Sequence, residues 1–256
     1  MEHLDAIRSS FSHQAGGYDA FSAAVDKERH LRQTVEALPL SPDDRALEVA
    51  SGTGIFARSL APRIREAVCL DATPAMLERA RGEAARRGIA NLRTVEGLAE
   101  ALPFEDESFD IVISRLALHH FPEISRPFAE MVRVLRPGGR LVVIDMEAAE
   151  PALRQTQDGI ERRRDPSHVQ NRSRREILAL YRQHGLEVVR METTGIPVPL
   201  HDWLRLTDTD AATGGTIAAQ MEAELSGGEP TGFDPFRRDG ALWFWQRWMF
   251  FLGLRR

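Results

Sequence analysis

Cysteine is nearly absent from the sequence: Cys69 is the only one among 256 residues. A lone thiol cannot form a disulfide within the chain, so the fold has to rest on its hydrophobic core. Cys69 lies in the apolar run 67–70, where a buried cysteine packs as a small hydrophobic side chain. We therefore expect a structural thiol at this position and not a nucleophile.

Long apolar runs and an excess of positive charge are missing as well. No apolar stretch approaches the roughly 20 residues that a helix needs to cross a bilayer, and the opening residues MEHLD lack the pattern of a secretion signal. The formal net charge is -5, which gives no global positive field to gather nucleic acid. We expect a cytoplasmic protein with no membrane partner and no nucleic-acid partner.

The composition that remains is that of an ordinary globular domain. Hydrophobic residues make up 43% of the chain and charged residues 28%, which suffices for a sizeable core. Strand-like and helix-like segments alternate along most of the chain, a pattern that indicates a parallel sheet with right-handed crossovers. The expected strands cover residues 47–50, 67–70, 92–96, 109–114, 141–144, 186–191 and 242–251.

The expected fold is α/β: a Rossmann-like, doubly wound, mostly parallel sheet of seven strands in a single domain, residues 1–256. Residues 1–44 carry apolar side chains at helical spacing and form an N-terminal helical cap. Residues 45–194 form the ligand-binding core. Glycine pairs and prolines interrupt residues 195–240, which we interpret as an insertion that covers the site before the last strand, 241–256.

The most specific local pattern is Leu-Glu-Val-Ala-Ser-Gly-Thr-Gly at residues 47–54. A strand that runs directly into Gly52 and Gly54 lets the backbone approach a ligand, and the following helix offers unpaired N–H groups. Asp71 ends the next strand, where a carboxylate accepts hydrogen bonds from both ribose hydroxyls. The alternatives are a tight strand-to-helix turn at the glycines and a solvated strand end at Asp71.

Glu48 distinguishes between the ligands that share this pattern. A dinucleotide would place a phosphate beside this carboxylate, which is electrostatically unfavourable, whereas S-adenosylmethionine has a cationic amino group and no phosphate. Glu48 therefore favours S-adenosylmethionine, although Gly52, Gly54 and Ala57 also fit the dinucleotide pattern Gly-x-Gly-x-x-Ala. An NAD(P)-binding oxidoreductase is the alternative.

Six motifs in order resemble those of class I S-adenosylmethionine-dependent methyltransferases, most closely the small-molecule branch that includes the ubiquinone and menaquinone methyltransferases. The resemblance implies methyl transfer from S-adenosylmethionine to an O, N or C nucleophile of a small-molecule acceptor. An RNA methyltransferase is disfavoured because the chain is acidic and has no recognisable RNA-binding module. A cofactor-binding protein without catalysis is a further alternative. The motifs are residues 48–54, 68–71 with 75–77, 96–104, 108–112, 117–121 and 135–139.

The resemblance also implies individual cofactor contacts. Glu48 is implied to bind the methionyl amino group, and Asp71 the ribose. Leu98 departs from the family pattern, which has an aspartate there for the adenine amino group. The remaining implied contacts lie in the glycine turn, beside the adenine, beside the methionyl chain and in the cap: Ala50, Gly52, Thr53 and Gly54; Ala72, Met76 and Ala99; Ser114 and Arg115; and Tyr18.

The sequence contains few signals that identify the residues of the acceptor site. His119 and His120 follow the fourth strand, and His168 lies in the polar stretch 162–168, which we expect to be a loop. His119 and His168 are candidate general bases, or else packed or surface histidines, while packing is the favoured interpretation for His120. We expect no metal site. Two further groups are open to a binding or a structural interpretation, and a solvated face is the more common one for the arginines: the arginines of 162–164 and 172–175, and Phe233, Phe236, Trp243 and Trp245.

Overall fold

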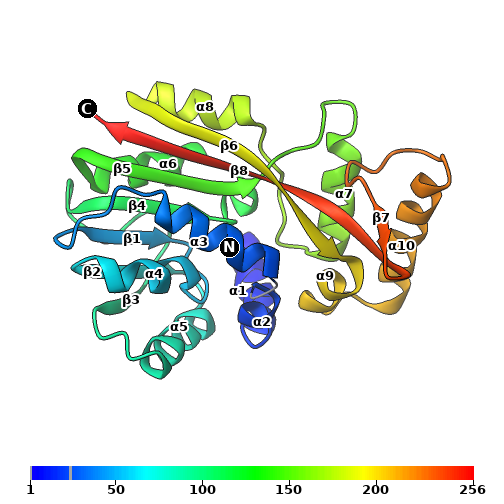
Figure 1. Cartoon of the computed structure of the whole chain (residues 1–256), viewed down its shortest axis with the longest axis horizontal. Coiled ribbons are helices and arrows are strands. Elements are labelled where there is room, and N and C mark those ends of the chain that lie inside the picture. The colour runs from blue at the N-terminus through cyan, green and yellow to red at the C-terminus, as the bar shows by residue number, and fades with distance from the viewer. Residues whose placement is uncertain (1, 23–24) are drawn as a thin grey trace.

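The computed structural model describes residues 2–22 and 25–256, whose strands form one open sheet (Figure 1). Five parallel strands come first along the chain. They are followed by two long strands, β6 (Leu186–Pro199) and β8 (Ala241–Arg255), and by the short β7 (Phe236–Arg238). The order is β3-β2-β1-β4-β5-β8-β6, with β8 antiparallel to both of its neighbours. The expected seven-stranded α/β fold is confirmed, and β7 adds a short strand beside β8. The five parallel strands are β1 (Arg45–Val49), β2 (Glu66–Asp71), β3 (Leu92–Glu96), β4 (Phe109–Arg115) and β5 (Leu135–Met146).

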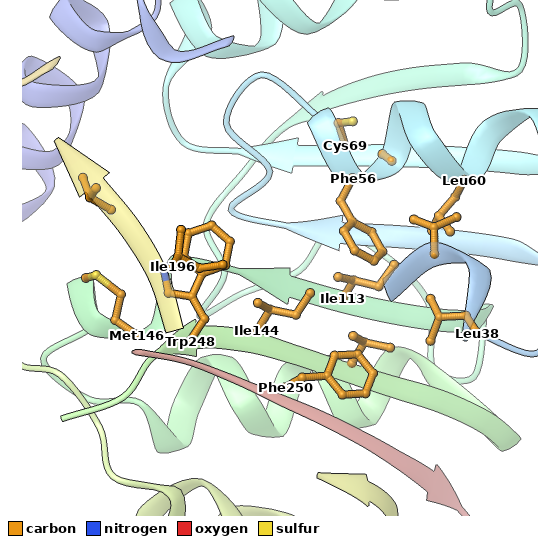
Figure 2. Close-up of a cluster of buried hydrophobic side chains, with 14 of the residues drawn as sticks. Leu38, Phe56, Leu60, Cys69, Ile113, Ile144, Met146, Ile196, Trp248 and Phe250 are labelled. Carbon is orange, nitrogen blue, oxygen red and sulfur yellow. The ribbon is translucent and has the colours of Figure 1, made fainter. Parts of the chain in front are cut away.

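Helices cover both faces of the sheet because the strands send alternate side chains to opposite sides. Leu47 and Val49 of β1 join a buried cluster with α6 and α8, whereas Ala46 of β1 and Cys69 of β2 join a cluster with α4. Figure 2 shows the second cluster, in which Cys69 is buried as expected. The helices of the first face are α6 (Ser125–Val134) and α8 (Arg174–Gln183), and those of the second are α3 (Val25–Glu36), α4 (Ile55–Leu60), η1 (Ala61–Arg63) and α5 (Pro74–Arg86).

The strand order reverses at β1, which has β2 on one side and β4 on the other. In open α/β sheets the crevice at the carboxyl ends of the strands beside such a reversal receives the ligand. The turn after β1 and the short helix η2 (Leu118–His120) after β4 both lie there. The N-terminal helices α1 (Glu2–Gln14) and α2 (Tyr18–Ser22) lie across the same end of the sheet (Figure 1).

Strands β6 and β8 continue beyond the sheet as a two-stranded ribbon that reaches a second lobe (Figure 1). Pairing between β5 and β8 ends at Trp248, whereas β6 stays paired with β8 as far as Trp243. The lobe contains α7 (Arg154–Arg164), α9 (Leu200–Leu206), α10 (Ala211–Leu225) and β7. Trp203, Phe233 and Phe244 form its aromatic core, with ring centroids 4.9–5.6 Å apart. In the part of the chain that is described, no helix has both the length and the apolar character needed to span a membrane.

The structure differs from the sequence-based expectation in two outer segments. The insertion starts at residue 200 and not at 195, because β6 stays paired with β8 up to Pro199. Residues 162–164 form the last turn of α7 and not a loop. The reason is that Arg164 turns inward and lies over the ring of Trp203, 4.4 Å from its centroid.

Candidate functional site

A cavity lies at the carboxyl ends of β1, β2 and β4, between the sheet and α1. Leu4, Ile7 and Phe11 of α1 form part of its wall. Three of the predicted cofactor residues, Thr53, Gly54 and Ser114, are buried outside it. Ten others line it: Tyr18, Glu48, Ala50, Gly52, Asp71, Ala72, Met76, Leu98, Ala99 and Arg115.

The turn after β1 has the backbone geometry that its glycines predict. Gly52 and Gly54 have φ angles of 53° and 68°, in the left-handed region that favours glycine. A Cβ on Gly54 would lie 2.7 Å from Sγ of Cys69, so glycine is needed for α4 to begin this close to β2. At Gly52 the nearest atom to a Cβ would be Sδ of Met76, at 3.9 Å, which leaves the backbone open to the cavity.

Asp71 fixes this turn to the end of β2. Its Oδ2 accepts a hydrogen bond from the Gly52 N–H at 2.7 Å, and its Oδ1 accepts one from the Thr73 N–H at 2.8 Å. Burial raises the pKa of Asp71, and the two backbone donors oppose that rise. Each carboxylate oxygen retains a second lone pair, so Asp71 can hold the turn and still accept a hydrogen bond from a ligand.

Glu48 is a carboxylate buried in the wall of the cavity. It is 3% exposed, and its Oε2 accepts one hydrogen bond, from the Ala57 N–H at 2.8 Å. Burial raises its pKa to about 7, although the Ala57 N–H, Arg115 and Arg58 favour the charged form. A buried carboxylate with so few donors is costly to ionise, and a cation entering the cavity would stabilise it.

The side chains around Glu48 divide into cavity walls and supports. Arg115 lies over the ring of Trp248, 5.3 Å from its centroid. Thr53 donates to Asp19 at 2.5 Å and so ties the glycine turn to α2. The hydroxyl of Ser114 has no hydrogen-bond partner among the described residues. Thr53 therefore supports the glycine turn from behind the cavity wall.

The outer rim of the cavity is mostly apolar. Leu98 is 39% exposed there, beside the buried Ala99. Helix α1 is tied to this rim because Arg8 donates to the carbonyl of Ala72 at 3.0 Å. Glu100 also lines the cavity, so it brings a carboxylate to the rim two residues after Leu98. Glu100 is not among the cofactor residues predicted from the sequence, because the family pattern places its adenine-binding carboxylate at position 98.

A second cavity continues from the first toward the second lobe. The two cavities share Phe11, Tyr18, Leu116 and His120, so these side chains form the wall between them. Leu116 has a φ of 53°, a strained conformation for a bulky residue that is often found at functional sites. The other residues of the second cavity are Gln14, Phe21, His119, Met146, Arg164, Asp165, Trp203, Leu206, Gln246 and Trp248.

His119 and Asp145 form a hydrogen-bonded pair at this cavity, with Nδ1 of the histidine 2.6 Å from Oδ1 of the aspartate. Asp145, at the end of β5, also accepts from the N–H groups of Leu118 and Met146, at 2.6 and 2.7 Å. Burial lowers the pKa of His119, but the charge and the hydrogen bond of Asp145, together with the charges of Glu161 and Asp165, outweigh burial and raise the pKa above 6.5. The sequence signal that was missed is a carboxylate inside the apolar strand that ends at Met146.

His168 is placed differently from His119. Its side chain is 1% exposed, its Nε2 lies 2.9 Å from Oδ1 of Asp158, and it lines neither cavity. The arginines near it are occupied: Arg162 donates to the Val169 carbonyl and Arg163 to Gln220. The structure therefore brings His119 to the second cavity and leaves His168 behind it.

Comparison with known proteins identifies the family. A model of the methyltransferase domain matches residues 47–143. The uncharacterized methyltransferase YcgJ of Bacillus subtilis is 35% identical over 170 residues, which cover 66% of this chain and 67% of that protein. Its crystal structure has a TM-score of 0.80 at 28% identity, covering 90% of this chain and 99% of the other.

Two further similarities concern proteins with named substrates. A demethylmenaquinone methyltransferase of Deinococcus radiodurans is 40% identical over 147 residues, 55% of this chain and 60% of that protein. A geranyl diphosphate methyltransferase, solved in complex with S-adenosylmethionine, has a TM-score of 0.65 at 19% identity. The alignment covers 94% of this chain and 91% of that protein's chain. The second similarity shows the fold alone.

Proposed function

This chain belongs to the S-adenosylmethionine-dependent methyltransferases, and from that premise we propose that it methylates a small molecule bound in the second cavity. The observation that carries the proposal is the wall that the two cavities share, which consists of Phe11, Tyr18, Leu116 and His120. A methyl group held in the first cavity at this wall faces an acceptor held in the second. An NAD(P)-dependent oxidoreductase, the alternative that the sequence left open, is excluded by the family.

The residues of the first cavity fit the cofactor. Glu48 would bind the amino group, since a cation removes the cost of ionising this buried carboxylate. Asp71 would hold the ribose, with Ala72, Met76 and Ala99 beside the adenine. When bound, S-adenosylmethionine supplies an electrophilic methyl group on a sulfonium centre. The open backbone at Gly52 leaves room for the ligand next to the turn.

His119 is our candidate for the proton acceptor. Its Nδ1 is engaged by Asp145, so the neutral ring presents its Nε2 lone pair to the second cavity, where His119 is a wall residue. Asp145 would stabilise the imidazolium that forms when the acceptor loses a proton. The rest of the rate enhancement would come from holding the acceptor in line with the bond between sulfur and the methyl carbon, and from excluding water from the site.

The lining of the second cavity favours a small molecule over a nucleic acid. Phe11 and Phe21, from the N-terminal helices, oppose Trp203 of the second lobe and Trp248 of β8. Aromatic walls contributed by three separate parts of the chain enclose a ligand of limited size. A polymer would require an open basic surface instead.

The experiment that tests the proposal has two stages. Calorimetry should show binding of S-adenosylmethionine and S-adenosylhomocysteine and no binding of NAD or NADP. An acceptor screen then monitors the release of S-adenosylhomocysteine, with mass spectrometry of ligands that purify with the protein as a guide to the acceptor. Tight NAD(P) binding, or cofactor binding that the Glu48→Ala change leaves intact, would contradict the proposal.

A further inference from the structure

His120 is a buried histidine that the mechanism above does not use, although it borders both cavities. Its Nδ1 lies 3.0 Å from the carbonyl oxygen of Ser167 and 3.2 Å from the Ser167 hydroxyl. A carbonyl oxygen only accepts hydrogen bonds, so Nδ1 must carry the proton. The lone pair of the neutral ring is therefore on Nε2, which has no hydrogen-bond partner among the described residues.

The surroundings of His120 keep its ring neutral. Burial and the neighbouring His119 lower the pKa of His120 to about 3, although Asp165 opposes them. Phe11 contacts the ring edge-to-face, with centroids 5.0 Å apart, and contributes no charge. At any physiological pH, Nε2 of His120 therefore accepts hydrogen bonds and does not donate them.

His119 repeats the same arrangement beside it. The two rings lie 4.1 Å apart, and in each the Nδ1 is engaged by the protein while Nε2 is left for a ligand. The nearest cation of the cavity, Arg164, is compensated by Glu161 at 3.4 Å and Asp165 at 3.8 Å. The second cavity thus offers two neighbouring hydrogen-bond acceptors and no uncompensated positive charge for an anionic group.

We propose that the acceptor is a planar ring with hydroxyl groups on two adjacent carbons, one hydroxyl bound by Nε2 of His120 and the other methylated. The inference rests on the proposed function. Because the two histidine rings are in contact, a ligand that bonds to both needs its two hydroxyl donors on adjacent atoms, and a flat ring packs well against the aromatic walls of the cavity. In the reaction the O–H bond breaks, its proton passes to Nε2 of His119, and the oxygen forms the bond to the methyl carbon. The sulfur keeps the electron pair of the broken S–C bond and leaves in S-adenosylhomocysteine.

The first test compares acceptors with the unaltered protein. Catechol, resorcinol, phenol and 2-methoxyphenol are titrated into the complex with S-adenosylhomocysteine, and their methylation is followed by release of that product. A site built to bind a hydroxyl discriminates strongly against analogues that lack it, because its buried acceptor is left unpaired. We expect catechol to bind about 10- to 100-fold more tightly than phenol and to have the highest kcat/KM. Equal use of phenol and catechol would overturn the inference.

The second test assigns the preference to His120. The His120→Phe change should reduce the ratio of catechol to phenol kcat/KM to near 1, and His120→Asn, which retains an acceptor oxygen, should restore part of it. His184→Phe is the control, because His184 is a partly buried histidine whose ring packs at a tilt against Phe128 and lines neither cavity. An unchanged ratio in a folded His120→Phe variant would overturn the inference. Failure of all acceptors and of S-adenosylmethionine binding would instead count against the proposed function.

Discussion

Glu48 is a residue at which ligand binding and folding stability oppose each other. Its pKa in the folded chain is about 7, against 4.5 as its ordinary value, because burial penalises the charged form. The folded state therefore binds more protons than the unfolded state between about pH 4.5 and 7, and stability falls as the pH rises through that window. At higher pH the penalty is constant, at roughly 3 kcal/mol.

The Glu48→Gln change should therefore stabilise the ligand-free protein at pH 8 by up to roughly 3 kcal/mol. At pH 4.5 the two proteins should differ little, because Glu48 is then protonated in the folded chain. Urea unfolding of both proteins across this pH range measures the effect. A constant difference at every pH would mean that the gain comes from packing and not from the charge.

The same pKa predicts how cofactor affinity depends on pH. If the ionised carboxylate binds the cationic amino group of S-adenosylmethionine, affinity should fall about tenfold for each pH unit below 7, and it should fall again above about pH 8, where an α-amino group loses its proton. The binding curve of Glu48→Gln should be weaker and nearly flat. Calorimetry at several pH values gives both curves, and a flat curve for the unaltered protein would show that Glu48 does not carry this contact.

Asp145 acts on the proposed reaction only through His119. Activity should rise as the pH increases through the pKa of His119, because the ring must be neutral to take a proton and Asp145 holds that pKa above 6.5. The Asp145→Asn change should move this rise to lower pH and reduce kcat by about 100-fold or more. The pH profile of kcat measures both effects. An unmoved profile with a lowered melting temperature would assign Asp145 to the fold, through its hydrogen bonds to the Leu118 and Met146 N–H groups.

At the scale of elements, α1 is held closed by a buried carboxylate. Asp165 accepts from the hydroxyl of Ser10 at 3.0 Å and from the amide of Gln14 at 3.4 Å. On its own side it accepts from the N–H and hydroxyl of Ser167, at 3.0 and 2.6 Å. Burial disfavours its charge, but Arg164 and the N–H and hydroxyl of Ser167 hold the pKa of Asp165 below its usual range. The helix that covers both cavities thus depends on a few charge-assisted hydrogen bonds.

The Ser10→Ala change should loosen α1 without unfolding the sheet. Loss of one hydrogen bond to a charged group costs about 1.5–3 kcal/mol, so amide exchange in α1 should become about 10-fold faster or more. Ser9→Ala is the matched control, since Ser9 is an exposed residue of the same helix. Equal exchange in the two variants would show that Asp165 does not determine the position of α1.

At the scale of the whole molecule, the second cavity exists only where three parts of the chain meet. The N-terminal helices contribute Phe11 and Phe21, the short helix η2 after β4 contributes His119, and the ribbon and second lobe contribute Trp203 and Trp248. Four of its wall residues also face the first cavity. A ligand in the first cavity therefore fixes one wall of the second.

We expect this shared wall to make binding ordered. The acceptor should bind at least about 10-fold more tightly to the complex with S-adenosylhomocysteine than to the ligand-free protein, because the first ligand has already immobilised part of the wall. By linkage, the acceptor should tighten S-adenosylhomocysteine binding by the same factor. Calorimetric titrations in both orders measure the two factors, and independent binding would contradict the coupling.

The sequence by itself predicted the sheet, the glycine turn and the family. These features are local: apolar periodicity places the strands, and the turn between β1 and α4 needs glycine because Gly54 begins the helix against Cys69. Cavity residues at the carboxyl ends of single strands, such as Glu48 and Asp71, lie beside the cavity because all parallel strands end at one edge. Their roles toward the cofactor stay predictions.

The tertiary structure alone decided which distant residues meet. Asp145 lies 26 residues after His119, and Ser10 lies 155 residues before Asp165, so no periodicity within one element relates the members of either pair. The two histidines judged equal from the sequence were separated by packing, which placed His119 at the second cavity and His168 behind it. His120 shows most clearly what the sequence alone does not predict. The direction of its free nitrogen follows from a hydrogen bond to Ser167, 47 residues away, and only the folded chain brings that carbonyl to the ring.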